Sequence, residues 1–330
     1  MAVSTPASSV SIVIPTYNRR ELALRAVQSV LEQAHAGTLE VIVVDDGSSD
    51  GTAEAVAATF RHDPRVQLIR SERGYACAAR NLGFRAARGD FVCFLDSDDF
   101  WLPGTLAVFE SVFAQTPGLA FVSVDGTTRA TTRKAAIQGI VARVSPGWSH
   151  AKFREAALVR QGLQLPGSTT PAELLVGDFF PAIIHGDLFY LSGLLVRREC
   201  VAQAGPFNER LRYFNDWEFF SRMCLVGPGA YVAHDGFRRE TDRADQLSRG
   251  RPGTTMPRRH LFIVRALMRR PDIPARYQPQ LKAALSDACY SFARSLLNAG
   301  RRSWARRYLR RCLQSGHKSF RCAVLYAFRN

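Results

Sequence analysis

The stretch GDFVCFLDSDDFW, residues 89–101, is the most informative part of this chain. Its apolar run at 91–95 predicts a buried β-strand, and three aspartates, Asp96, Asp98 and Asp99, follow that strand within four positions. Carboxylate oxygens at this density are the ligands that Mg²⁺ and Mn²⁺ prefer, especially when the metal also holds a diphosphate. The strand tip is therefore predicted to bind a cation. The alternative is a solvated acidic turn in which Asp99 caps the next helix.

Strands and helices alternate over the N-terminal part of the chain. Buried strands are predicted at 10–15, 39–44, 66–70 and 90–95, and helices at 20–33, 52–60 and 75–87. Such alternation with short connections predicts an α/β, Rossmann-like fold, in which helices flank a mostly parallel sheet. Ligands of such sheets bind beyond the carboxyl ends of the strands. Polar clusters at 15–19, 45–50 and 96–99 follow three of these strands, and we expect them to converge.

The remainder of the chain has a different organisation. Residues 126–186 show weak helical stretches broken by proline and glycine, and we interpret them as an insertion that shapes a substrate cleft. A strand at 187–197 is expected to return to the sheet, and 215–226 is predicted to be helical. The C-terminal part has an all-helical pattern, with amphipathic helices at 281–298 and 301–314.

Composition narrows the class of protein. The chain has 330 residues, of which 46% are hydrophobic, enough for one large α/β domain or a domain with an appendage. No apolar run approaches the roughly 18 residues of a membrane span, and the N-terminus lacks the basic and apolar regions of a signal peptide. The seven cysteines include no CxxC pair. We therefore expect buried thiols in a reducing compartment, and neither a disulfide frame nor a zinc site.

The net charge of +15 lies at one end of the chain. Residues 251–330 hold 18 Lys or Arg and two acids, a net charge of +16, whereas residues 1–250 hold 26 bases and 27 acids, a net charge of −1. Because Trp304 and Tyr308 lie among the arginines, an anionic membrane surface is the favoured partner. Nucleic acid is disfavoured, since no recognised nucleic-acid motif accompanies the charge. A solvated basic face on a helical cap is the remaining alternative.

Several motifs, taken in order, resemble those of the family 2 glycosyltransferases, which have the GT-A fold. In the first 125 residues they are SIVIPTYNR at 11–19, VVDDGSSDGT at 43–52, ARNLG at 79–83, ARGD at 87–90 and FLDSDDFWLP at 94–103. The later ones are VRRE at 196–199, GPFNE at 205–209 and NDWEF at 215–219. Each motif alone is a weak signal, and the resemblance depends on their common order and spacing.

The resemblance implies a site for a nucleotide-sugar donor. Pro15, Thr16 and Tyr17 would bind the donor, with Pro15 and Tyr17 lining the base pocket. Asp46 would accept a hydrogen bond from the imide N–H of uracil or thymine, and Arg80 would face the base or a phosphate. The residues themselves leave other roles open: a plain strand-to-helix turn, stabilisation of the next helix by Asp46, or an ion pair between Arg80 and Asp46.

The aspartates at the strand tip match the DxD motif of that family. The resemblance implies that Asp98 coordinates Mn²⁺ or Mg²⁺ directly, and that Asp96 and Ser97 contact the ribose or the metal and its waters. The metal would bridge two phosphates and neutralise charge on the departing nucleoside diphosphate. Asp99 would face hydroxyls of the donor sugar or cap the following helix. An ion pair between Arg80 and Asp96 is the structural alternative.

Asp216 matches the catalytic base of inverting family members. It would accept the proton of an acceptor hydroxyl as that hydroxyl attacks the anomeric carbon from the face opposite the diphosphate. Glu218 is the rival base, but side chains two positions apart on one helix point in different directions. A helix N-cap is the alternative role of Asp216. Downstream, Arg238 or its neighbour Arg239 would neutralise phosphate, and His234 is a weaker candidate for a metal ligand.

These residues predict an inverting glycosyltransferase that moves a sugar from a nucleotide diphosphate, preferably UDP, to a glycan or lipid-linked acceptor. The resemblance implies a GT-A domain at 1–250, with a nucleotide-binding half at 1–125 and an acceptor half at 126–250. A basic, all-helical extension follows at 251–330. We expect the protein in the cytoplasm, held peripherally at the inner membrane face by that extension. A catalytically silent GT-A scaffold and a nucleic-acid-binding protein that uses the basic helices are the alternatives.

Overall fold

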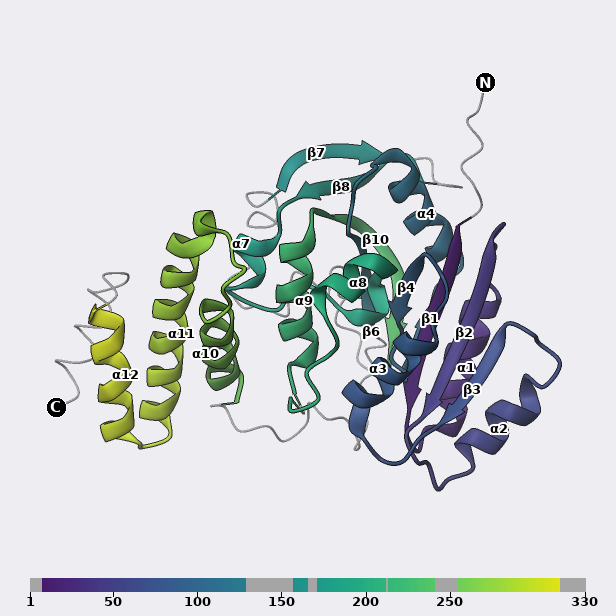
Figure 1. The fold of residues 1–330 in the computed structure, drawn as a ribbon, viewed down its shortest axis with the longest axis horizontal. Coiled ribbons are helices and arrows are strands. Elements are labelled where there is room, and N and C mark those ends of the chain that lie inside the picture. Colours follow the sequence, from purple (N-terminus) through teal and green to yellow (C-terminus); the bar gives the residue numbers. More distant parts are fainter. Residues whose placement is uncertain (1–7, 129–156, 166–170, 212, 241–254, 315–330) are drawn as a thin grey trace. The chain divides into compact units, whose positions relative to one another are not determined.

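The computed structural model describes residues 8–128, 157–165, 171–211, 213–240 and 255–314. The chain divides into two compact units (Figure 1). The first contains Met1–Phe179 and Leu188–Arg243, and the second contains Phe180–Asp187 and Ala244–Asn330. A short segment from the middle of the chain thus belongs with the C-terminal helices, which the sequence pattern does not indicate.

The first unit begins with alternating strands and helices. The elements are β1 (Ser9–Thr16), α1 (Arg20–Leu31), β2 (Thr38–Asp45), α2 (Thr52–Thr59), β3 (Val66–Arg70), α3 (Tyr75–Ala86) and β4 (Phe91–Phe94). The four strands pair in parallel in the order β3-β2-β1-β4 (Figure 1). Every residue of β4 is buried, as expected for a strand whose sheet is covered on both faces. The predicted parallel α/β arrangement is confirmed.

The rest of the first unit extends this sheet. The elements are β5 (Asp99–Trp101), α4 (Thr105–Gln115), β6 (Phe121–Thr128), β7 (Ala157–Leu163), β8 (Ala172–Gly177), β9 (Leu194–Arg197), α8 (Arg198–Ala204), α9 (Asn215–Val226) and β10 (Gly229–Arg239). In the described residues the strand order is β3-β2-β1-β4-β9-β6-β10-β8-β7, and β5 pairs with β10. Strand β10 is parallel to β6 but antiparallel to β5 and β8, so this part of the sheet is mixed.

The region that the sequence predicts to be weakly helical differs most from expectation. Among its described residues, β7 and β8 form an antiparallel hairpin, and β8 pairs with β10. The expectation of helical stretches at 126–186 is therefore wrong over these strands. Pairing with a strand from far along the chain decides their conformation, and a local pattern cannot show that pairing. The strand expected at 187–197 is also shorter, because Leu191–Gly193 form a 3₁₀ turn before β9.

Helix α3 lies close against the sheet. A Cβ atom on Gly83 would lie 2.3 Å from Cγ1 of Val13 and 3.1 Å from Cγ2 of Val44, so this close approach requires a glycine. Arg80 lies one turn earlier on the same helix and is only 6% exposed. The close packing of α3 against β1 and β2 therefore fixes the position of Arg80 at the edge of the sheet.

The elements described in the second unit are helical. They are α7 (Phe180–Ile183), α10 (Thr255–Met268), a 3₁₀ turn (Ala275–Tyr277), α11 (Gln278–Asn298) and α12 (Arg302–Gln314). The helices predicted at 281–298 and 301–314 correspond to α11 and α12 and are confirmed. Their apolar faces meet in a core that includes Leu261, Phe292 and Leu309. Within the described part of the chain, no helix is both long and apolar enough to cross a lipid bilayer.

Among the cysteines that the structure describes, all but one follow the sequence expectation. Five are free and buried: Cys77, Cys93, Cys200, Cys224 and Cys289. Cys312 of α12 is disulfide-bonded, so the expectation of unpaired thiols is wrong at this position. Spacing along the chain does not reveal which thiols meet in space.

Candidate active site

The carboxyl ends of β1, β2 and β4 lie at one edge of the sheet, because the three strands are parallel. Hydrogen bonds join the turns that follow them. The Asp46 N–H donates to the Thr16 carbonyl at 2.9 Å, and the Asn18 N–H donates to Oγ of Ser48 at 2.9 Å. Residues 96–99 follow β4 at the same edge. The structure thus brings together the three polar clusters that we expected to converge.

Two of the three aspartates after β4 are paired with arginines. Oδ1 of Asp96 accepts a hydrogen bond of 2.6 Å from Nη2 of Arg80. Oδ1 of Asp98 lies 3.0 Å from Nη1 of Arg19, which also donates to Oγ of Ser97 at 3.4 Å. Of the two ion pairs considered for Arg80 from the sequence, the structure contains the one with Asp96. Arg19 was not singled out from the sequence, although it ends the polar turn after the first strand.

Asp99 does not cap a helix. It is the first residue of β5, and its Oδ2 accepts a hydrogen bond of 2.5 Å from Oγ of Ser192. The next helix, α4, begins at Thr105, after Gly104 with φ of 85°. The capping role considered for Asp99 is therefore wrong.

Burial and neighbouring charges shift the pKa values of the three aspartates in different directions. Burial raises the pKa of Asp99 well above its ordinary value, and the charges of Asp98 and Asp96 raise it further. Burial also raises the pKa of Asp98, against the opposing charge of Arg19. At Asp96 the effect of burial is outweighed, chiefly by the charge and hydrogen bond of Arg80, so its pKa lies below the ordinary value. A bound cation would relieve the repulsion among these groups.

The arginine of β10 that faces the aspartates is Arg239. Its guanidinium carbon lies 5.4 Å from the centroid of the Tyr190 ring. Burial lowers the pKa of Arg239, but the negative charge of Asp99 and its neighbours outweighs this and leaves the pKa raised. Arg238 is exposed, and successive side chains of a strand point to opposite faces. The structure thus places Arg239, and not Arg238, beside the acidic residues.

A second cluster at this edge joins Tyr17, Asp46 and Arg73. Pro15 and Thr16 are buried in β1, whereas the Tyr17 side chain is 38% exposed. The guanidinium carbon of Arg73 lies 3.1 Å from the centroid of the Tyr17 ring, and its Nε lies 3.6 Å from Oδ2 of Asp46. An exposed aromatic face beside a carboxylate has the chemistry of a nucleobase subsite. Arg73 was not identified from the sequence. Its position in the polar turn after β3 is the feature that could have indicated it.

Arg80 also reaches helix α9. Its Nη1 donates to Oδ1 of Asn215 at 3.0 Å, while its Nη2 binds Asp96. Asn215 precedes Asp216, the predicted base. Burial raises the pKa of Asp216; a hydrogen bond from the Trp217 N–H and the charge of Arg80 oppose this, and the charge of Asp96 adds to it. Asp216 and Asp96, far apart in the sequence, are therefore close enough to interact electrostatically.

Glu218, the rival base, has a structural partner. It binds Arg222 through two hydrogen bonds of 2.9 Å, from Nε to Oε1 and from Nη2 to Oε2. Arg222 also donates to the carbonyls of Gly205 at 2.9 Å and Pro206 at 2.8 Å. Glu218 thus helps to hold α9 against the loop that follows α8.

Backbone strain occurs beside the site. Among the described residues, the non-glycine residues with positive φ are Asn18 at 49°, Tyr75 at 66° and Phe214 at 58°. Such conformations cost roughly 1–3 kcal/mol each and are frequent at functional sites. Tyr75 begins the helix that carries Arg80, and Phe214 precedes the helix that carries Asp216. Because Phe214 occupies the N-cap position of α9, the capping role considered for Asp216 is wrong.

Several buried polar atoms at this edge have no hydrogen-bond partner among the residues that the structure describes. They are Oγ1 of Thr16, Oδ1 of Asp45, Nε of Arg80 and Oδ1 of Asp99. Buried polar groups in native proteins are nearly always paired. Unpaired donors and acceptors at this edge of the sheet indicate a site that a polar ligand or water completes.

The residues present fit a metal only together with a nucleotide. Within the described ranges, no three His, Cys, Asp or Glu side chains are grouped so that they could hold a metal ion by themselves. A nucleotide-bound Mg²⁺ takes only one or two carboxylates, and phosphate oxygens and water complete its coordination. The carboxylates of Asp96 and Asp98 and the unpaired oxygen of Asp99 are donors of the right chemistry. His234 is half-buried in β10, and burial lowers its pKa.

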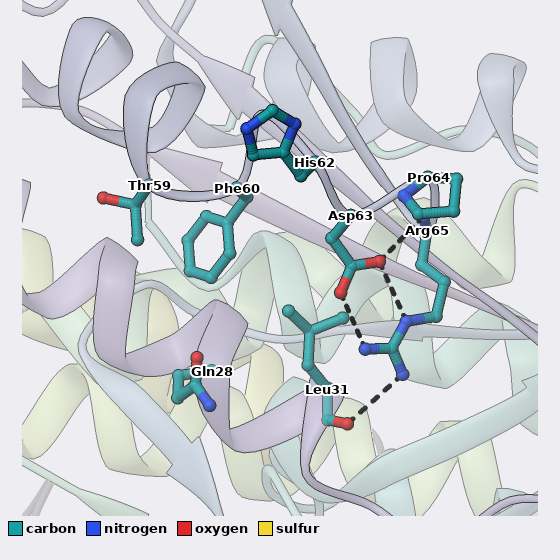
Figure 2. Close-up of a pocket in the computed structure, with 8 residues that line it drawn as sticks. All are labelled: Gln28, Leu31, Thr59, Phe60, His62, Asp63, Pro64 and Arg65. Carbon is teal, nitrogen blue, oxygen red and sulfur yellow. Dashed lines mark hydrogen bonds and ion pairs between the residues drawn. The ribbon is translucent and has the colours of Figure 1, made fainter.

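A cavity of about 580 Å³ lies elsewhere in the first unit (Figure 2). It is lined by residues at the ends of α1 and α2 and just before β3. An ion pair of 2.7 Å between Arg65 and Asp63 lies in it, and Arg65 donates to the Leu31 carbonyl at 3.3 Å. These residues precede β3, whereas the candidate site lies where the parallel strands end. The cavity is therefore not part of the candidate active site.

Comparison with known proteins agrees with this geometry. Residues 11–170 match the family model described as "Glycosyl transferase family 2". The chain belongs to this family. Among relatives of this family 2 glycosyltransferase chain, the succinoglycan biosynthesis protein ExoO of Rhizobium meliloti is 32% identical over 234 residues, 68% of this chain and 60% of that protein. Glycosyltransferase GlyG of Streptococcus pneumoniae is 36% identical over 91 residues, 27% of this chain and 30% of GlyG. The chain therefore spans less than two thirds of either relative.

Solved structures share the GT-A-like fold of this family 2 chain. TarS of S. aureus superposes with a TM-score of 0.61 at 15% identity, over 93% of this chain and 80% of the TarS fragment. The mannosyltransferase PcManGT of Pyrobaculum calidifontis, in complex with GDP-Man and Mn²⁺, has a TM-score of 0.57 at 19% identity, over 98% of this chain and 84% of PcManGT. At these identities the likeness shows the fold alone.

Proposed function

We propose that this chain is an inverting glycosyltransferase that transfers a sugar from a nucleotide-diphosphate donor to a hydroxyl of a glycan or lipid-linked acceptor. The observation that carries this proposal is the double contact of Arg80 with Asp96 and Asn215. The anomeric carbon of a donor lies between its diphosphate and the attacking hydroxyl, so the groups that serve these two ends must be close together. Arg80 joins the acidic strand tip to the residue before Asp216.

The proposed donor is a UDP-sugar. Tyr17 offers a partly exposed aromatic ring. Asp46, whose Oδ1 already accepts from the Gly74 N–H at 2.7 Å, has further lone pairs that can accept from the imide N–H of uracil. TarS has been solved with UDP-GlcNAc, and PcManGT with GDP-Man. Since this fold accommodates both bases, selection of uracil would depend on Tyr17, Asp46 and Arg73.

A divalent cation, Mn²⁺ or Mg²⁺, is proposed to bind together with the donor. When bound, it would neutralise charge on the departing diphosphate. Asp98 and Asp96 would supply its carboxylate ligands, and Arg239 would add positive charge beside them. Because Arg19 pairs with Asp98, it would have to release this carboxylate first.

Asp216 is proposed as the general base. Its carboxylate takes the proton of the acceptor hydroxyl while the hydroxyl oxygen forms a bond with the anomeric carbon. The bond from that carbon to the diphosphate oxygen breaks, and its electron pair leaves with the nucleoside diphosphate. Attack from the opposite face inverts the anomeric configuration. The raised pKa of Asp216 suits this role, because a more basic carboxylate accepts a proton more readily.

The proposed acceptor is a glycan or a lipid-linked glycan. The relative ExoO is named for succinoglycan biosynthesis, which supports a role in making polysaccharide. We place the reaction in the cytoplasm. The basic C-terminal unit is proposed to keep the enzyme at an anionic acceptor or at the membrane surface that carries it.

A donor screen tests the proposal. The purified chain is incubated with UDP-, GDP- and dTDP-sugars and Mn²⁺, and release of nucleoside diphosphate is measured. We expect slow, metal-dependent hydrolysis of a UDP-sugar, which Asp98→Ala abolishes. Asp63→Asn, a change of carboxylate beside the cavity of Figure 2, serves as the control and should retain the activity. Donor binding without nucleotide release would identify a silent scaffold instead.

A further inference from the structure

The second unit carries a groove of about 1290 Å³, formed by α10, α11 and α12. One wall is a stripe on α10 and just beyond it, where Arg258, Phe262, Arg265 and Arg269 recur at the spacing of one helix face. The start of α12 and the turn before it also line the groove, with Trp304 and Arg301. All of these residues lie in one compact unit, so the groove does not depend on how the two units are placed.

The groove is positively charged. Of the described residues that line it, four are arginines (Arg258, Arg265, Arg269 and Arg301) and none is an aspartate or glutamate. None of the four forms an ion pair with a carboxylate in the described ranges, whereas Arg270, outside the lining, lies 2.6 Å from Asp272. Unneutralised arginines that share one concave surface attract an anion, because a guanidinium binds carboxylates and phosphates through two parallel hydrogen bonds.

The same groove exposes aromatic faces. Trp304 is 52% exposed and Phe262 is 43% exposed. The guanidinium carbon of Arg265, on α10, lies 5.9 Å from the centroid of the Tyr308 ring, on α12, so a cationic and an aromatic side chain meet in the groove. Large aromatic side chains left open in a concave site offer flat apolar surfaces for a ligand. The apolar faces of sugar rings pack on such surfaces.

We propose that this groove binds an anionic glycan, a saccharide chain that carries carboxylate groups, and thereby holds the acceptor for the transferase. The proposal deepens the proposed function by naming the acceptor class, and it rests on that function. A concave groove favours a single chain over a bilayer, since a membrane-bound helix instead presents a projecting apolar face. Single-stranded nucleic acid also combines anionic groups with stacking rings and must be distinguished by experiment.

Calorimetry on the full chain tests the proposal. The probe is an oligogalacturonate of defined length, and its fully methyl-esterified form is the uncharged control with the same sugar rings. We expect binding of the acid and at least about tenfold weaker binding of the ester, the loss expected when charge-assisted hydrogen bonds disappear. Equal affinity for the two forms, or no binding of either, would overturn the proposal.

Variants locate the site. The double variant Arg265→Gln/Arg301→Gln and the single variant Trp304→Ala should each weaken binding of the acid at least about tenfold. Arg294→Gln, an exposed residue of α11 outside the lining, is the matched control and should bind normally. Thermal unfolding shows whether each variant is folded. If the double variant is unstable, Trp304→Ala still tests the site, because Trp304 is exposed and its replacement should leave the fold intact. Unchanged binding by Trp304→Ala would overturn the proposal.

Two further probes identify the class of partner. Vesicles of phosphatidylglycerol and phosphatidylcholine, and a single-stranded oligothymidylate, are titrated against the same variants. Tighter binding of either, lost in the double variant and kept in Arg294→Gln, would replace the glycan by that ligand and overturn the proposal. Hydrolysis of the donor without acceptor is measured in parallel and should be unchanged in all groove variants. Failure of the groove proposal therefore differs from failure of the proposed function, which would abolish hydrolysis in the unmodified chain.

Discussion

Asp96 and Asn215 share one guanidinium: Arg80 donates to Asp96 at 2.6 Å and to Asn215 at 3.0 Å. The first contact is at the tip of β4, and the second is at the first residue of α9. A buried charge is tolerated where it is paired and hydrogen-bonded, and Arg80 meets both conditions. The separation between the acidic strand tip and Asp216 therefore depends on a residue of a third element, α3.

Replacement of Arg80 by alanine should reduce stability as well as activity. It would leave the half-buried carboxylate of Asp96 without its partner. Loss of one member of a fully buried pair costs about 3–5 kcal/mol, and because the Asp96 side chain is 34% exposed, solvent screening should keep the loss below that range. The free energy of unfolding in urea measures this. The pKa of Asp96 is lowered in the folded state, so the pair stabilises the protein above the ordinary pKa, and this contribution is lost as pH falls through the lowered pKa. An equal deficit at neutral pH and in strong acid would contradict this explanation.

Asp216→Asn should separate donor binding from transfer. Asparagine cannot accept the proton, so kcat should fall by about 10²–10⁴, while the Kd for UDP stays unchanged. Transfer of labelled sugar and calorimetry measure the two quantities. Asp63→Asn makes the same chemical change away from the candidate site and should preserve both. Full transfer by Asp216→Asn would remove this residue from the mechanism.

The raised pKa of Asp216 predicts two effects of pH. A general base must be ionised. We therefore expect kcat/KM to decrease as pH falls through the pKa of Asp216, which lies above the ordinary pKa of aspartate. A pKa raised in the folded state means that stability is highest when Asp216 is protonated and is lost as pH rises through that pKa. Asp216→Asn should therefore have a higher Tm than the unmodified protein at neutral pH. A lower Tm of Asp216→Asn would show that the ionised carboxylate of Asp216 does not destabilise the folded protein.

Arg19→Ala should increase the affinity for Mn²⁺ in the presence of saturating UDP. Arg19 lies 3.0 Å from Asp98 and competes with any cation for that carboxylate. We expect Mn²⁺ binding, measured by electron paramagnetic resonance, to tighten several-fold. Arg20→Ala removes the same charge from an exposed neighbouring residue and should leave Mn²⁺ binding nearly unchanged. If both variants behave alike, the competition is general charge repulsion and not the contact with Asp98.

Tyr17→Ala should weaken UDP binding with little loss of stability. Stacking of a base on an aromatic ring contributes about 1–3 kcal/mol, so the Kd should rise about tenfold or more. The ring is 38% exposed, and the Tm should change little. Tyr17→Phe keeps the aromatic face and should bind UDP nearly normally. A normal Kd for Tyr17→Ala would place the base elsewhere.

Much of the first unit follows from local sequence patterns. Apolar runs of strand length, separated by amphipathic helices and turn residues, predict β1 to β4. They also predict a parallel arrangement, because parallel neighbours need a long crossover connection, which is usually a helix. The position of Asp96, Asp98 and Asp99 at a strand tip follows from the same pattern. The hairpin of β7 and β8 does not, since its strands depend on pairing with β10.

The amino-acid sequence by itself determined the order of strands and helices, the acidic turn at the sheet edge and the concentration of positive charge at the C-terminus. Tertiary structure alone decided which arginine meets which aspartate: Arg19 with Asp98, Arg80 with Asp96, and Arg239 in place of Arg238 beside the acidic cluster. It also arranged part of the C-terminal charge into a groove with aromatic walls. The physical reason is that periodicity and turn chemistry act between near neighbours in the chain, whereas these contacts join segments that only the packed sheet and helices bring together.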